Sequence, residues 1–128
     1  MTDTSKLRYT ETHEWVDLNG KTATVGITEH AQKEISDVVF VELPKIGLEA
    51  KKKDSVMVIE SVKAAFDIYA PISGKIIEVN EKLKDKPETV NRSPYGDGWL
   101  YRIECSDRAE WEALMTEPQY KSAASHSH

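Results

Sequence analysis

Short strand-like segments separated by turn residues constrain the fold of this 128-residue chain more than any other feature. Two of these segments flank Asn19-Gly20, a dipeptide that strongly indicates a tight β-hairpin turn. Their apolar and β-branched composition is typical of strands packed in a sheet. The predicted strands are residues 15–18, 22–27, 37–43, 55–60, 65–69, 75–79 and 100–105. The chain is therefore expected to be mainly β.

Two helices are expected beside these strands. Thr28 can cap a short helix over residues 29–34. A second, C-terminal helix begins at Ser106 or Asp107, and three apolar residues share one of its faces at a spacing of three and four. These residues are Trp111, Leu114 and Met115, of which Trp111 is expected to anchor the helix to the core.

The length predicts a single domain over residues 1–128, with a folded core at about residues 7–120. The small polar residues 121–128 are expected to form a disordered tail.

Composition argues against several classes of function. A net charge of −5 disfavours nucleic acid as a partner, and no stretch is apolar enough to span a membrane. One cysteine, Cys105, allows no internal disulfide and is expected to be a packed thiol. Two of the four histidines lie in the tail, so no metal cluster is expected. No catalytic triad or phosphate-binding glycine loop is found, which argues against an enzyme.

Lys63 is the most informative residue for function. An apolar strand segment precedes it, and Phe66-Asp67-Ile68-Tyr69 forms another that starts three residues after it, so the lysine lies at or beside a hairpin tip. A lysine at a tight tip is exposed on a stiff base, whereas a catalytic lysine needs burial. Covalent modification of Lys63 is therefore the first hypothesis.

Several motifs, in order and with the expected spacing, resemble the H protein of the glycine cleavage system, a free-standing lipoyl carrier. The resemblance covers about residues 9–120. The matching segments are Tyr9-Thr10-x-x-His13-Glu14-Trp15, Ala23-Thr24-Val25-Gly26-Ile27-Thr28, Asp37-Val38-Val39-Phe40-Val41-Glu42-Leu43-Pro44, Glu60-Ser61-Val62-Lys63-Ala64, Tyr69-Ala70-Pro71-Ile72-Ser73-Gly74, Val90-Asn91 and Pro94-Tyr95-Gly96-Asp97-Gly98-Trp99-Leu100.

The resemblance implies a lipoyl/biotinyl-type hammerhead β-sandwich, a flattened barrel with short helices and a C-terminal helix. It also implies that lipoic acid is amide-linked to Lys63. Lipoyl-attaching enzymes would recognise the hairpin through Glu60 and its neighbours. The residues that match the family here are Glu60, Ser61, Val62 and Ala64, together with Gly74 in the adjoining turn.

The implied partners are three enzymes. Glycine decarboxylase (P protein), which uses pyridoxal phosphate, passes the aminomethyl group of glycine to the arm. Aminomethyltransferase (T protein) gives the one-carbon unit to tetrahydrofolate and releases ammonia. Dihydrolipoyl dehydrogenase (L protein) then reoxidises the dithiol with NAD. The chain itself is expected to be a non-catalytic shuttle.

The resemblance further implies that the loaded arm folds back onto the carrier. A protonated amine suits a nearby carboxylate, and exclusion of water would slow the loss of ammonia. Glu14 is the first choice for the amine partner. The other expected pocket residues are Thr12, His13, His30 and Asp67.

Other carriers and an adaptor remain as alternatives. A biotin carrier typically has methionines around its lysine, and a 2-oxoacid dehydrogenase lipoyl domain has an acidic residue before it; here the neighbours are Val62 and Ala64. A lipoate-relay carrier, or an unmodified β-sandwich that binds proteins through an acidic face, also stays open. We expect a monomer in the bacterial cytoplasm, or in the mitochondrial matrix if a transit peptide has been removed.

Overall fold

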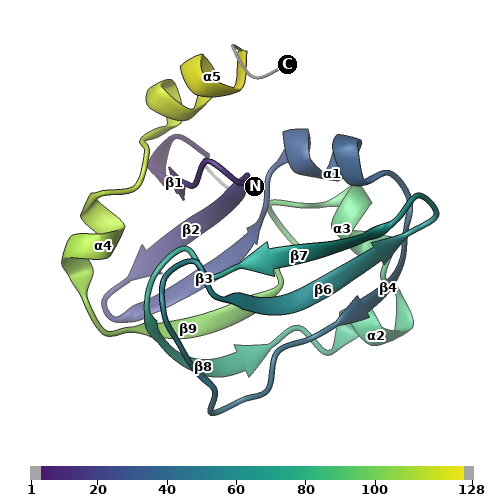
Figure 1. Ribbon diagram of the computed structural model, residues 1–128, viewed down its shortest axis with the longest axis horizontal. Coiled ribbons are helices and arrows are strands. Elements are labelled where there is room, and N and C mark those ends of the chain that lie inside the picture. Colours follow the sequence, from purple (N-terminus) through teal and green to yellow (C-terminus); the bar gives the residue numbers. More distant parts are fainter. Residues whose placement is uncertain (1–3, 126–128) are drawn as a thin grey trace.

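The computed structural model describes residues 4–125, and their nine strands form two antiparallel sheets (Figure 1). The larger sheet has the order β1-β2-β3-β9-β8-β5, and the smaller has the order β4-β6-β7. The strands of the larger sheet are β1 (Arg8–Tyr9), β2 (Glu14–Asn19), β3 (Thr22–Ile27), β5 (Glu49–Ala50), β8 (Gly74–Val79) and β9 (Tyr101–Cys105). Those of the smaller sheet are β4 (Val38–Glu42), β6 (Ser55–Ser61) and β7 (Ala65–Tyr69).

The expected mainly β sandwich is confirmed, although the strands of residues 4–125 do not close into a barrel. Each predicted strand is present, and β3 and β7 have the predicted bounds. The β2–β3 hairpin turns at Asn19-Gly20, where Gly20 has a φ of +65° that glycine adopts without strain. The two-residue strands β1 and β5 were not predicted, because two residues are too few to show the alternation of apolar and polar side chains that indicates a strand.

The core lies between the two sheets, where alternate side chains of each strand point inward. Ile59 and Ile68 come from the smaller sheet and pack in one cluster with Val25, Ile76 and Ile103 from the larger one. All five are almost fully buried. The smaller sheet is therefore anchored by its apolar face, and its outer face and the β6–β7 tip are left in solvent.

Helix α1 (Glu29–Ile35) begins as predicted. The Thr28 hydroxyl accepts a hydrogen bond from the Ala31 amide at 3.2 Å, which satisfies one of the free donors of the first turn. Two one-turn helices, α2 (Lys82–Asp85) and α3 (Thr89–Arg92), were not predicted. Each contributes a single buried apolar residue, and one residue cannot produce a helical period.

The helix predicted to start at Ser106 or Asp107 is present, but its expected continuation to Met115 is wrong. Asp107 caps α4 (Arg108–Glu112), but that helix ends before Leu114, and a separate helix α5 (Glu117–Ser125) follows. Met115 instead pairs with Tyr9, exchanging backbone hydrogen bonds of 2.8 and 3.0 Å. These long-range bonds replace those that a continuous helix would make.

Trp111 and the end of α5 differ from expectation in their exposure and in their extent. Trp111 is only partly buried, with the guanidinium groups of Arg8 and Arg108 at 4.7 and 5.0 Å from its ring centre. It nevertheless packs against the core, as predicted. Helix α5 continues to Ser125, into the segment expected to be disordered, and residues 126–128 lie outside the described residues. No helix of the described chain is both long and apolar enough to cross a membrane.

Candidate functional site

Lys63 lies in the three-residue turn between β6 and β7, at the tip of the smaller sheet. The Ser61 hydroxyl accepts hydrogen bonds from the backbone amides of Lys63 and Ala64, at 3.1 and 3.2 Å. The Val62 amide donates to the Asp37 carbonyl at 3.0 Å and so ties the tip to the start of β4. The backbone is held on both sides, while the Lys63 side chain is exposed.

The neighbours of Lys63 offer a continuous exposed surface. Glu60, Val62 and Ala64 are exposed, and Val62 is 68% accessible despite its apolar side chain. Ser61 is half-buried because it braces the turn. Gly74 is not part of this surface. It is buried in β8, where a Cβ would overlap the carbonyl oxygen of Glu104 on β9.

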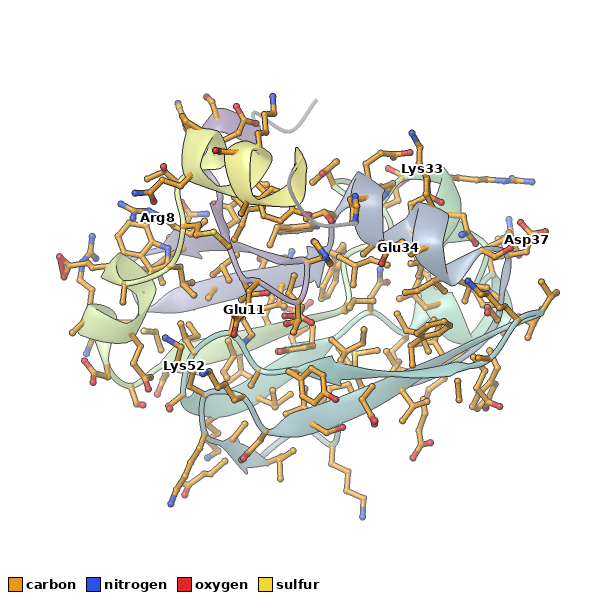
Figure 2. The ribbon with its side chains drawn as sticks, turned by 45° about the horizontal axis from the view of Figure 1, so that its top comes forward. Arg8, Glu11, Lys33, Glu34, Asp37 and Lys52 are labelled. Atoms are coloured by element: carbon orange, nitrogen blue, oxygen red, sulfur yellow. The ribbon has the colours of Figure 1, made fainter. Side chains whose placement is uncertain are left out.

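A cavity of about 670 Å³ lies near the other end of β7. It is lined by the Thr10–Glu14 loop, by the β7 end at Tyr69 and by the segment after α4. Glu11 and Lys52, which are labelled in Figure 2, both line it and bring opposite charges to its wall. The volume falls within the range of small-molecule sites.

Glu14 is the buried acid of this cavity, with only 2% of its surface accessible. The hydroxyls of Thr10 and Thr12 each donate to its Oε1 at 2.5 Å. Burial raises the pKa of Glu14, and hydrogen bonds from the two threonines and from the Tyr69 backbone act against that rise. A pocket role for Thr10 or Tyr69 was not predicted from the sequence. The two threonines that lie four and two positions before Glu14 are the signal that could have indicated such a role for Thr10.

The other expected pocket residues fall in two different places. Asp67 is exposed on β7, does not line the cavity, and accepts a hydrogen bond from the Ser55 hydroxyl at 2.9 Å. His13 and His30 lie together between the cavity loop and α1, with ring centres 4.3 Å apart. Of the five expected residues, the structure therefore brings only Thr12 and Glu14 into the cavity wall.

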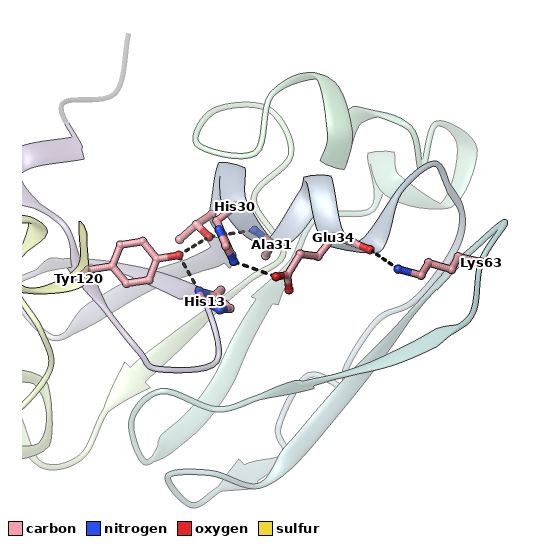
Figure 3. A network of polar contacts seen from close by, with 7 residues as sticks. His13, His30, Ala31, Glu34, Lys63 and Tyr120 are labelled. Atoms are coloured by element: carbon pink, nitrogen blue, oxygen red, sulfur yellow. Dashed lines mark hydrogen bonds and ion pairs between the residues drawn. The ribbon is translucent and has the colours of Figure 1, made fainter. Parts of the chain in front are cut away.

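The two histidines belong to a polar chain that runs from α5 toward the hairpin tip (Figure 3). His13 Nδ1 lies 2.7 Å from the Tyr120 hydroxyl, which is 2.8 Å from the Thr28 hydroxyl. His30 Nε2 lies 2.9 Å from Glu34 Oε1. Burial and the adjacent His30 lower the pKa of His13, whereas Glu34 raises it. Burial also raises the pKa of Tyr120 to about 12, which keeps its hydroxyl protonated at neutral pH.

The β-sandwich fold, the exposed lysine on a braced hairpin and the separate acid-lined cavity are typical of a small carrier protein. The family model described as Glycine cleavage H-protein matches residues 7–127. The chain belongs to the glycine cleavage H-protein family, whose members serve as lipoyl carrier subunits in glycine cleavage. The resemblance drawn from the motifs is thereby confirmed.

Individual relatives agree with this assignment. The chain is 57% identical over 114 residues to a glycine cleavage system H protein of Thermotoga maritima, covering 89% of this chain and 92% of that protein. It is 54% identical to a probable glycine cleavage system H protein of Aeropyrum pernix, covering 89% and 80%. The crystal structure of a glycine cleavage system H protein from Mycobacterium marinum superposes with a TM-score of 0.86 at 35% identity, covering 94% and 98%.

Proposed function

We propose that this chain carries lipoic acid in amide linkage on Lys63 and shuttles the aminomethyl group of glycine between the enzymes of glycine cleavage. The observation that carries the proposal is the exposed Lys63 side chain on a turn whose backbone is fixed by Ser61 and Asp37. An attaching enzyme needs a reachable amine in a reproducible position, and this turn supplies both.

The residues around Lys63 fit an acylated lysine. Among residues 4–125 no carboxylate forms an ion pair with its amine; the amine contacts only the Glu34 carbonyl oxygen, at 3.3 Å. Acylation removes the positive charge, so no charged partner would be left behind. We also propose that the attaching enzyme reads Glu60, Ser61, Val62 and Ala64. In this proposal Gly74 contributes indirectly, by letting β8 and β9 approach.

When bound, the lipoyl group would supply the dithiol that accepts the aminomethyl cargo. The chain's own residues would then protect the cargo in the cavity. Glu14 would pair with the protonated amine, and hydrogen bonds from the Thr10 and Thr12 hydroxyls favour its ionised form against the effect of burial. The buried position of Glu14 would exclude water from the amine and slow the release of ammonia.

The cavity and Lys63 are far enough apart to require a long arm. Tyr69 at the cavity wall is six positions after Lys63, which is roughly 20 Å of extended chain at the usual rise. His13 and His30 do not line the cavity, and neither does Asp67, which is exposed on β7. The partners in the proposal are P protein, T protein and L protein, with this chain as a non-catalytic monomer in the cytoplasm.

The test is intact mass with peptide mapping after incubation with lipoate, ATP and a lipoyl-attaching enzyme. We expect one lipoyl-sized increment confined to Lys63. It should be absent from Lys63→Arg and present in Lys51→Arg, a matched exposed lysine. A glycine–bicarbonate exchange assay with P protein should then fail only for Lys63→Arg. Full exchange activity of Lys63→Arg would refute the proposal.

The role of Glu14 has a separate test. Glu14→Ala should accept lipoate normally but release ammonia from the loaded protein at least several times faster than wild type. Glu11→Ala, which removes an exposed acid from the same cavity wall, is the matched control. An unchanged rate of ammonia release from Glu14→Ala would refute the role given to Glu14.

A further inference from the structure

His13, His30 and Glu34 form a cluster that lies outside the Glu14 cavity and that the proposed carrier function does not use. One ligand atom from each lies within 4.8 Å of the other two. We propose that this cluster binds a divalent transition-metal ion of the zinc class. Two imidazoles with one carboxylate are a zinc ligand set that leaves a fourth position open.

The fold presents these residues in a suitable way. His30 and Glu34 are four residues apart on α1, so both side chains project from the same face of the helix. His13 approaches from the loop before β2, where its φ of +72° turns the residue out of the extended path. Figure 3 shows the two imidazoles and the Glu34 carboxylate converging between helix and loop.

His30 Nε2 is the observation that points most directly to a ligand. It is buried and has no partner in hydrogen-bond geometry among the described residues, although Glu34 Oε1 lies only 2.9 Å away. The carboxylate contacts this nitrogen outside hydrogen-bond geometry, so the nitrogen has lost water without gaining a well-aligned partner. A metal ion placed between the imidazole and the carboxylate would satisfy both.

His13 already has the second contact that metal-bound histidines usually make. Its Nδ1 lies 2.7 Å from the Tyr120 hydroxyl, and that hydroxyl is within 2.8 Å of Thr28 Oγ1, the cap of α1. If the tyrosine donates to Thr28, it accepts from His13 Nδ1–H. The imidazole then keeps its Nε2 lone pair for a metal, with its ring orientation fixed.

The geometry requires only a small adjustment. Nitrogen and oxygen ligands at about 2.0–2.2 Å in a tetrahedral site lie roughly 3.4 Å from one another. The widest separation permitted here, 4.8 Å, must close by on the order of 1 Å. Glu34 is 61% exposed and His30 32% exposed, so both side chains have room to rotate.

The test is isothermal titration of the unlipoylated full chain with Zn²⁺, in a His126→Ala/His128→Ala background that removes the tail histidines. We expect one ion per chain. His30→Ala and Glu34→Gln should each weaken binding at least tenfold, and Glu29→Gln, an acid of the same helix outside the cluster, should bind like the parent. Binding that survives His30→Ala unchanged, or no binding to the parent, would overturn the proposal.

Two further measurements separate a ligand role from a folding role. Co²⁺ should give the intense visible absorption of a four-coordinate site in the parent and not in His13→Asn, a substitution that tolerates positive φ. Zn²⁺ should raise the melting temperature of the parent but not of His30→Ala, because only a native-state site is linked to stability. A Zn²⁺-induced shift of equal size in both proteins would refute the proposal.

Discussion

The Nζ of Lys63 lies 3.3 Å from the carbonyl oxygen of Glu34, so the hairpin tip rests against the C-terminal end of helix α1. This contact joins the smaller sheet to a helix that follows the larger one. An acylated lysine keeps one N–H on the same nitrogen. Acylation therefore removes a charge but leaves a donor that can still reach this carbonyl, so the tip need not rearrange to be modified.

The first prediction is that Lys63 contributes almost nothing to folding. Its side chain is exposed and forms no ion pair among residues 4–125, so Lys63→Met should change the unfolding free energy by less than about 0.5 kcal/mol. Urea unfolding followed by circular dichroism measures this. A loss above about 1 kcal/mol would show that the tip lysine is a structural residue.

The second prediction concerns the pH dependence of stability. Burial raises the pKa of Glu14 in the folded protein, so the folded state holds this proton more tightly than the unfolded state. The contribution of Glu14 to the free energy of unfolding is greatest below pH 4.5, the ordinary pKa of a glutamic acid. It is lost as the pH rises through the raised pKa of the folded state. Glu14→Gln should therefore be more stable than wild type at pH 7.

Urea unfolding of both proteins between pH 4 and pH 8 measures this difference. The advantage of Glu14→Gln should shrink as the pH falls toward the ordinary pKa of a glutamic acid. Glu11→Gln, at an exposed position in the same loop, should show no such trend. If Glu14→Gln were less stable than wild type at pH 7, the threonine hydrogen bonds would outweigh the cost of burial.

The third prediction separates folding from recognition at Gly74. A Cβ there would overlap the Glu104 carbonyl oxygen, and the backbone of β9 cannot move without disturbing the sheet. Gly74→Ala should cost about 2 kcal/mol or more of stability. Lipoylation of its folded fraction should proceed at the wild-type rate. Lys75→Ala, at the next and exposed position, is the control, and slow lipoylation of fully folded Gly74→Ala would contradict this view.

The fourth prediction concerns Asn91, which joins α3 to the connection between α1 and β4. Its side chain accepts from the Val38 amide at 2.9 Å and donates to the Ser36 carbonyl at 2.8 Å. Asn91→Ala leaves both backbone groups without these partners and should cost roughly 2–3 kcal/mol. Thermal unfolding measures the loss, and the neighbouring exposed Arg92→Ala should be nearly neutral. Equal stability of the two variants would refute the bracing role.

Local sequence patterns were sufficient for the seven longer strands, the α1 cap and the Lys63 hairpin. Each depends on neighbouring residues alone: Asn19-Gly20 sets a turn, Thr28 caps its own helix, and two apolar runs enclose Lys63. The expected continuation of the C-terminal helix to Met115 was wrong, because contacts between distant residues decide where that helix ends. Met115 has an apolar side chain at helical spacing, but its backbone bonds to Tyr9, more than one hundred residues away in sequence.

The sequence by itself determined the mainly β class, the order of the strands along the chain and the exposure of Lys63, because these follow from periodicity and turn chemistry between close neighbours. Only the tertiary structure decided which of the expected acids is buried. Glu14 and Asp67 look alike in sequence, yet one lies in a cavity between loops and the other in solvent. Likewise, only folding brings His13 beside His30, since burial and proximity across distant segments depend on how the sheets pack.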